Sequence, residues 1–90
     1  MSICICIPKV ESNVTKHYII NAFKQFNIGH IFRINLVNSK EKKNKLAFVY
    51  IKNLNDNSNT KTILKSMEEN IDFKVMHDFP NFWKCYKAND

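Results

Sequence analysis

Glycine is almost absent from this sequence, and that scarcity excludes several classes of enzyme. Gly29 is the only glycine. Loops that cradle phosphate through backbone N–H groups need several glycines, and a nucleophile elbow needs one on each side of its serine. Neither pattern occurs in the chain. We therefore expect a protein that binds a partner, with no catalytic activity and no small-molecule substrate.

Arginine is equally scarce, although the chain is basic. Arg33 is the only arginine among 14 basic residues, which outnumber 8 acidic ones and give a formal charge of +6. Lysine is a point charge without the planar fork that reads guanine edges. The charge therefore favours attraction to a nucleic-acid backbone over sequence reading. Solubility alone is the competing explanation.

Cysteine and long apolar runs are also in short supply. The chain has three cysteines, Cys4, Cys6 and Cys85, and an odd number without paired spacing does not predict a disulfide framework. Nor do these cysteines together with His77 have the paired spacing of a small zinc site. We expect a reducing, intracellular compartment, cytoplasmic or nuclear, and no cofactor. The apolar start, residues 3–7, is too short for a signal segment, and no stretch approaches the length of a membrane span.

Aromatic residues are well represented. Seven Phe, three Tyr and one Trp contribute to a hydrophobic content of 44%. A chain of 90 residues with that content can bury one core. We therefore expect a single domain over residues 1–90.

The spacing of apolar residues predicts alternating strands and helices. The expected order is a strand at residues 3–7 ended by Pro8, a helix at about 14–26 stopped near Gly29, strands at 31–37 and 46–51, and a helix at about 60–69. Residues 73–76 and 82–86 also resemble strands, with a turn at 78–81. Either a hairpin precedes the last strand, or the first of these pieces is an extended lead-in.

Alternation assigns faces to the strands. In residues 31–37, Phe32 is expected to face one side with the other even-numbered residues, and Arg33 the opposite side. In residues 46–51, the even-numbered Leu46, Phe48 and Tyr50 share a face.

The last strand has the same two-residue period. Lys84 lies between Phe82 and Tyr86 on one face, and the lysine indicates that this face points outward. Trp83 is then expected in the core.

The element order β-α-β-β-α-β is that of the ferredoxin-like fold, and three segments resemble the RNA recognition motif (RRM). Residues 22–37, AFKQFNIGHIFRINLV, are similar to its "LFxxFGxIxxVxLV" stretch. Residues 44–51 resemble its third-strand octamer, and residues 3–8 its first-strand hexamer. The resemblance implies an α+β two-layer sandwich: a four-stranded antiparallel sheet, two helices on one face and single-stranded RNA on the other. Residues 78–88 also resemble tails of small proteins of large DNA viruses, which would place the protein in a host cell.

The family stacks bases on aromatic residues of the octamer and hexamer, and this chain keeps few of them. The second base-stacking position of the octamer is Phe48, but the first is Leu46, and the aromatic position of the hexamer is Ile3 or Cys4. Other rings of the sheet are then needed as substitutes.

The residues expected to bind single-stranded RNA or DNA follow from this comparison. Phe48 and Tyr50 stack bases beside Leu46, and Phe82 and Tyr86 extend the platform. The basic residues Arg33, Lys43 and Lys45 neutralise phosphates. Binding is expected to be weak and sensitive to salt.

The sequence fits one alternative function and lacks a residue that another would need. The same apolar sheet face, or the helical face, could bind a protein partner or a second copy of the chain. Acylphosphatases share this fold and size, but they need an arginine in the loop after the first strand, and residues 9–13 contain none.

Overall fold

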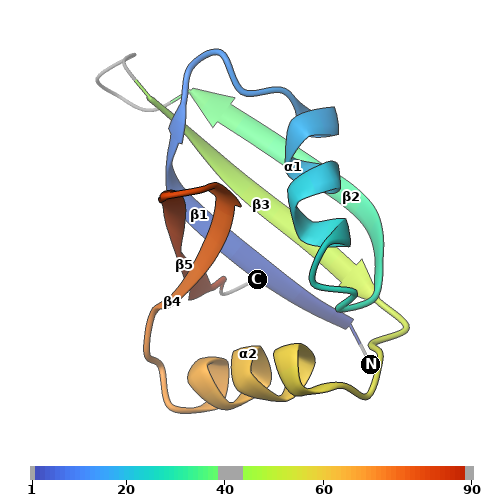
Figure 1. The fold of residues 1–90 in the computed structure, drawn as a ribbon. Coiled ribbons are helices and arrows are strands. Elements are labelled where there is room, and N and C mark those ends of the chain that lie inside the picture. Colours follow the sequence, from blue (N-terminus) through green and yellow to red (C-terminus); the bar gives the residue numbers. More distant parts are fainter. Residues whose placement is uncertain (1, 39–43, 89–90) are drawn as a thin grey trace.

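A computed structural model describes residues 2–38 and 44–88 as two helices and one antiparallel sheet of five strands (Figure 1). The elements are β1 (Ser2–Glu11), α1 (Lys16–Lys24), β2 (His30–Asn38), β3 (Asn44–Lys52), α2 (Ser58–Glu68), β4 (Phe73–Asp78) and β5 (Asn81–Lys87). The strand order across the sheet is β2-β3-β1-β5-β4. The fold is therefore α+β, as the sequence predicts.

The expected count of four strands is wrong. The hairpin considered for the end of the chain is present, with β4 and β5 joined by a turn at Phe79 and Pro80. β5 pairs with β1, and β4 forms the outer edge of the sheet. Residues 73–76 thus belong to a full strand.

Strand β1 does not end at Pro8. Its pairing with β3 continues to Glu11, with a bulge between Ile7 and Val10. A bulge accommodates a residue without an N–H group, since one strand contributes an extra residue there. The strand is central, as its apolar character on both faces predicts.

Helix α1 is shorter than the helix expected at residues 14–26, and α2 begins before the expected residue 60. Side-chain caps set both starting points. The Thr15 side chain accepts a hydrogen bond from the Tyr18 N–H at 3.1 Å at the start of α1. Asn57 does the same for Thr60 at 2.9 Å in α2. Within residues 2–38 and 44–88, neither helix has the length and apolar character to cross a membrane.

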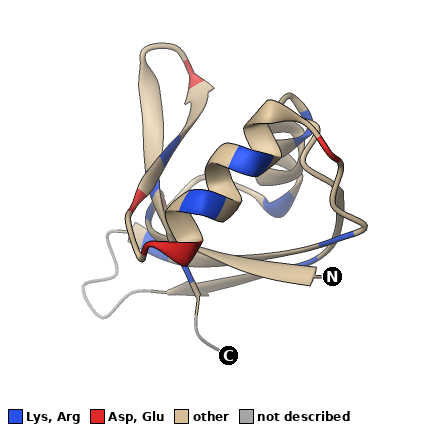
Figure 2. Cartoon of the chain, turned by 90° about the horizontal axis from the view of Figure 1, so that it is seen from below, with Lys and Arg blue, Asp and Glu red and all other residues tan. Residues whose placement is uncertain are grey.

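The hydrophobic core lies between the helices and one face of the sheet. Seen from below in Figure 2, both helices lie on the same side of β1 and β3. The buried side chains of this layer include Ile5, Ile7, Ile19, Phe23, Ile34, Val49, Ile51, Ile63, Val75 and Trp83. Trp83 is 2% exposed, which confirms its expected place in the core.

The turn between α1 and β2 is tied to the loop before α2. Asn27 has a φ of 51°, and its carbonyl oxygen accepts hydrogen bonds from the side chains of Asn55 and Asn57 at 2.8 and 2.7 Å. Gly29 does not act as the helix stop, because α1 ends earlier. A Cβ on Gly29 would lie 2.8 Å from the Lys52 carbonyl oxygen, so close packing against the end of β3 explains this glycine.

Candidate nucleic-acid interface

The sheet has a second face, which points away from the core, and the strand register identifies its members. Directly opposed residues of an antiparallel pair share a face. Phe48 pairs with Cys6 and with Asn35, and Cys6 pairs with Tyr86. We call this surface the open face; its side chains include Ser2, Cys4, Cys6, His30, Phe32, Arg33, Asn35, Val37, Leu46, Phe48, Tyr50, Lys52, Lys74, Met76, Phe82, Lys84 and Tyr86.

One aromatic and basic cluster lies on β2 and β3. The Phe32 and Tyr50 rings are 6.1 Å apart between centroids. The guanidinium of Arg33 lies 5.4 Å from the Tyr50 centroid, and the Lys52 ammonium lies 5.3 Å from that of Phe32. The Arg33 Nε–H also donates to Asn35 at 3.3 Å. Two rings and two cations are therefore packed together at the surface.

Phe32 belongs to this cluster because of a bulge, and its expected position with Ile34 is wrong. The register shifts between Ile31 and Arg33, so Phe32 and Arg33 together oppose Tyr50. The extra residue places Phe32 on the open face, where it is 45% exposed. Simple alternation gives no signal for such a bulge, which is why sequence reasoning missed Phe32.

A second aromatic and basic cluster lies on β4 and β5. Lys74 pairs with Lys84, and Met76 with Phe82. The Lys74 ammonium lies 4.7 Å from the Phe82 ring centroid. Lys84 makes an ion pair with Asp72 at 4.0 Å. The Lys84 and Asp72 side chains are both exposed, so their ion pair is weak. A competing anion can therefore replace Asp72 at the Lys84 ammonium.

The register brings most of the predicted site residues together and separates others. Phe48, Tyr50 and Leu46 of β3 share the open face with Arg33, Phe82 and Tyr86. Lys45 pairs with Val10 and alternates with Ala47, both of which are buried under the helices. It therefore lies on the opposite side of the sheet from Phe48. Lys43 lies outside the described residues.

The cysteines divide between the two faces and form no disulfide. Cys6 lies on the open face, and burial raises the pKa of its thiol. Cys85 is fully buried in the core, where burial and then the nearby Cys6 raise its thiol pKa to about 12. Among the described residues, no group of three or more His, Cys, Asp or Glu side chains is arranged to hold a metal ion.

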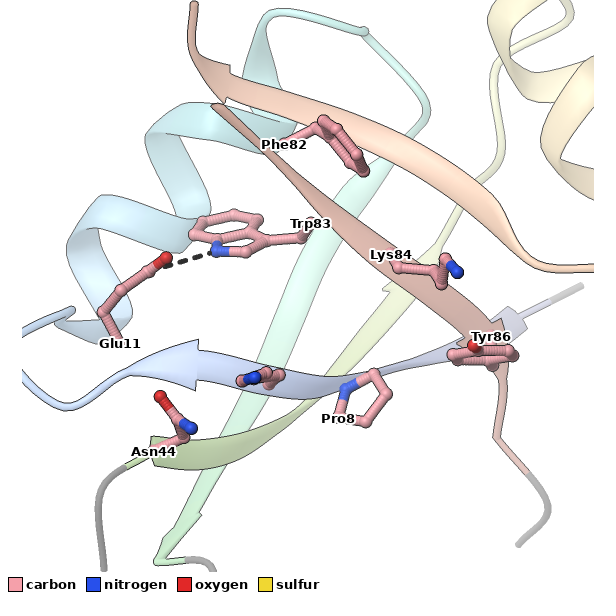
Figure 3. Close-up of a pocket in the computed structure, with 8 residues that line it drawn as sticks. Pro8, Glu11, Asn44, Phe82, Trp83, Lys84 and Tyr86 are labelled. Carbon is pink, nitrogen blue, oxygen red and sulfur yellow. Dashed lines mark hydrogen bonds between the residues drawn. The ribbon is translucent and has the colours of Figure 1, made fainter. Parts of the chain in front are cut away.

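A groove opens at the boundary between β1 and β5. It has a volume of about 530 Å³ and lies between the bulge of β1 and the β5 side chains Phe82, Lys84 and Tyr86 (Figure 3). Trp83 reaches it from the core side, where the indole N–H donates to Glu11 Oε2 at 3.3 Å. The groove thus continues the open face beside the second cluster.

Trp83 is itself held by a stack of rings behind the groove. Its ring lies parallel to His77 at 4.0 Å and meets Tyr18 edge-on at 5.9 Å. The Tyr18 hydroxyl and His77 Nδ1 are hydrogen-bonded at 2.9 Å. These contacts fix the position of the indole and, through its N–H, that of Glu11.

No protein-family model matches this chain, and neither a curated protein nor a solved structure gives a match.

Proposed function

We propose that this protein is an RRM-like domain that binds single-stranded RNA or DNA on its open face. One observation carries the proposal: aromatic rings and basic side chains are interspersed across a sheet surface that points away from both helices. The rings are Phe32, Phe48, Tyr50, Phe82 and Tyr86; the basic residues are Arg33, Lys52, Lys74 and Lys84. Rings for bases and cations for phosphates are the two components of sequence-tolerant single-strand binding.

The topology supports the RRM-like part of the proposal. β1 and β2 both pair antiparallel with β3, so they run parallel on either side of it and α1 connects them. β5 lies antiparallel on the other side of β1. Removing the edge strand β4 leaves the order β2-β3-β1-β5. We propose that this is a ferredoxin-like sheet with one strand added at its edge.

The cations above the rings are compatible with stacking. An exposed cation–π contact contributes about 0.5–1 kcal/mol, whereas stacking of a base on an aromatic ring contributes roughly 1–3 kcal/mol. A base can therefore displace Lys52 from Phe32, or Lys74 from Phe82. Each displaced ammonium remains beside the ring, where the phosphate of the stacked nucleotide would lie.

Affinity is expected to be modest and specificity over most of the face low. Lysine supplies three of the four cations named above, and it lacks the planar fork with which arginine reads guanine edges. We expect dissociation constants in the micromolar range or above, rising steeply with salt.

Fluorescence anisotropy of a labelled random single-stranded RNA tests the proposal. Phe48→Ala is expected to weaken binding about tenfold, the equivalent of roughly 1.4 kcal/mol of lost stacking. Phe79→Ala is the matched control, because Phe79 is 82% exposed in the turn of the hairpin and is not among the paired residues that define the open face. It should bind as the wild type does.

Two outcomes would overturn the proposal. The first is equal RNA affinity of the wild type and Phe48→Ala, when circular dichroism shows that both of these proteins are folded. The second is no binding at low salt, where lysine attraction is strongest. In that case a shift from monomer to dimer with concentration in light scattering would favour the alternative, a protein contact made through the same apolar surface.

A further inference from the structure

The groove between β1 and β5 exists because these two strands pair over only a short length. Their paired residues are Ile5 with Lys87 and Cys6 with Tyr86. Beyond them β1 reaches Pro8, which has no N–H to donate, and then the bulge before Val10. The strands separate there and leave the volume of about 530 Å³. That volume is within the range of pockets that bind small organic ligands.

The lining of the groove is divided into three kinds of surface. Pro8, Phe82 and Tyr86 provide apolar area, as Figure 3 shows on the two separating strands. Lys9 and Lys84 supply positive charge. A groove lined by apolar area and by two basic side chains suits a planar base whose phosphates stay at the rim.

Glu11 and Asn44 add a polar end to this slot. They are opposed to each other in the β1–β3 pairing, and both line the groove. The Trp83 indole N–H donates a hydrogen bond to Oε2 of Glu11, and this contact holds the carboxylate in place. An ionised carboxylate has two oxygens and about four acceptor sites, so Glu11 keeps capacity for further donors. The Asn44 amide can both donate and accept.

A carboxylate beside an amide can distinguish between bases by their donors and acceptors. Guanine carries two adjacent donors on its Watson–Crick edge, the N1–H and the N2 amino group, beside the O6 acceptor. A carboxylate accepts from both donors, and an amide N–H can donate to O6. Uracil has one N–H between two carbonyl oxygens, which a carboxylate repels. Single-stranded recognition commonly uses these edges of splayed-out bases.

We propose that the β1–β5 groove is a pocket for one nucleotide and that Glu11 makes it select guanosine within a bound single strand. The inference rests on the proposed nucleic-acid function and adds to it a base preference at one position. The rest of the open face continues to bind without strong preference, because its contacts are stacking and phosphate contacts.

The test compares labelled oligouridine with three versions that carry a single central guanosine, adenosine or cytidine. The guanosine version is expected to bind wild-type protein about tenfold more tightly than oligouridine, as for one good bidentate base contact. Glu11→Gln keeps an acceptor for the Trp83 N–H but replaces the carboxylate. In this variant the guanosine preference should fall to within about twofold, while oligouridine binding stays the same or strengthens slightly.

Glu68→Gln is the matched control, because it makes the same charge change at an exposed position on α2. It should keep the full guanosine preference. Trp83 supplies a second readout, since it is the only tryptophan and lines the groove. Its fluorescence should change on addition of guanosine monophosphate and change less with uridine monophosphate.

The outcomes separate the inference from the function on which it rests. Equal binding of all four oligonucleotides, or a guanosine preference that persists in Glu11→Gln, would overturn the pocket and leave the open-face proposal standing. Failure of every oligonucleotide to bind at low salt would overturn both.

Discussion

The Cys85 thiol shows how burial of a single residue links folding to pH. It is fully buried, and its pKa rises from an ordinary 9.0 to about 12. Below pH 9 the thiol is protonated in both the folded and the unfolded chain. Between pH 9 and about 12 the unfolded chain loses this proton while the folded protein keeps it. The folded state then binds more protons, so its stability falls as the pH rises through this window.

We therefore predict a stability loss between pH 9 and pH 12 that depends on Cys85. A shift of this size corresponds to at most about 4 kcal/mol. Cys85→Ala should be less stable at neutral pH because packing is lost, but its unfolding free energy should decline less steeply in alkali. Urea titrations over a pH series measure both slopes. Parallel slopes for wild type and variant would contradict the assignment.

At the scale of elements, the turn between α1 and β2 determines how the helix layer meets the end of β3. Two neighbouring positions in that turn have different physical requirements. Asn27 needs a left-handed backbone, with a φ of 51°, which glycine adopts freely. Gly29 needs the absence of a Cβ, since one would lie 2.8 Å from the Lys52 carbonyl oxygen and 3.0 Å from Ile51.

We predict that Gly29→Ala destabilises the protein by about 1–3 kcal/mol, because backbone must move to relieve the contact. For a domain of this size that lowers Tm by roughly 5–20 °C. Asn27→Gly is the paired variant, and its cost should stay below about 1 kcal/mol. Thermal melts followed by circular dichroism compare the two. A Gly29→Ala melt as high as that of Asn27→Gly would show that the turn can adjust.

The hairpin of β4 and β5 is the element that extends the candidate interface. It contributes Phe82 and Lys74 as a second aromatic and basic cluster, and its tip packs His77 against Tyr18 of α1. The same hairpin carries Trp83 into the core. One element thus joins the core, the groove and the open face.

At the scale of the whole molecule, the placement of charge matters more than its total. Basic residues lie on the helices as well as on the strands (Figure 2), so only part of the formal charge of +6 belongs to the open face. Only cations near the bound strand release counterions on binding. Among residues 2–38 and 44–88, the open face has four of them, Arg33, Lys52, Lys74 and Lys84.

We predict that the logarithm of RNA affinity falls with the logarithm of salt concentration with a slope of about −1.5 to −3, as for two to four phosphate contacts to a single strand. Replacing Lys52 and Lys84 together by Gln should bring the slope about 1.4 units closer to zero. The control replaces Lys24 and Lys65 by Gln, which removes the same charge from the exposed helix surfaces. Equal slopes in the two double variants would show that net charge alone drives binding.

Much of the fold follows from local periods that any reader can find in the sequence. Two-residue alternation placed Phe48 and Tyr50 on one face, Phe82 and Tyr86 outward and Trp83 in the core. It succeeds because side chains of a regular strand alternate whatever the partner strand is.

Tertiary structure alone decided the departures from that regularity. The bulge at Phe32 and the continuation of β1 through Pro8 both depend on register with another strand. One extra residue in a strand changes the face of every residue beyond it, and only long-range pairing determines where it is inserted. The groove has the same origin, because it forms where β1 stops pairing with a strand about eighty residues later in the chain.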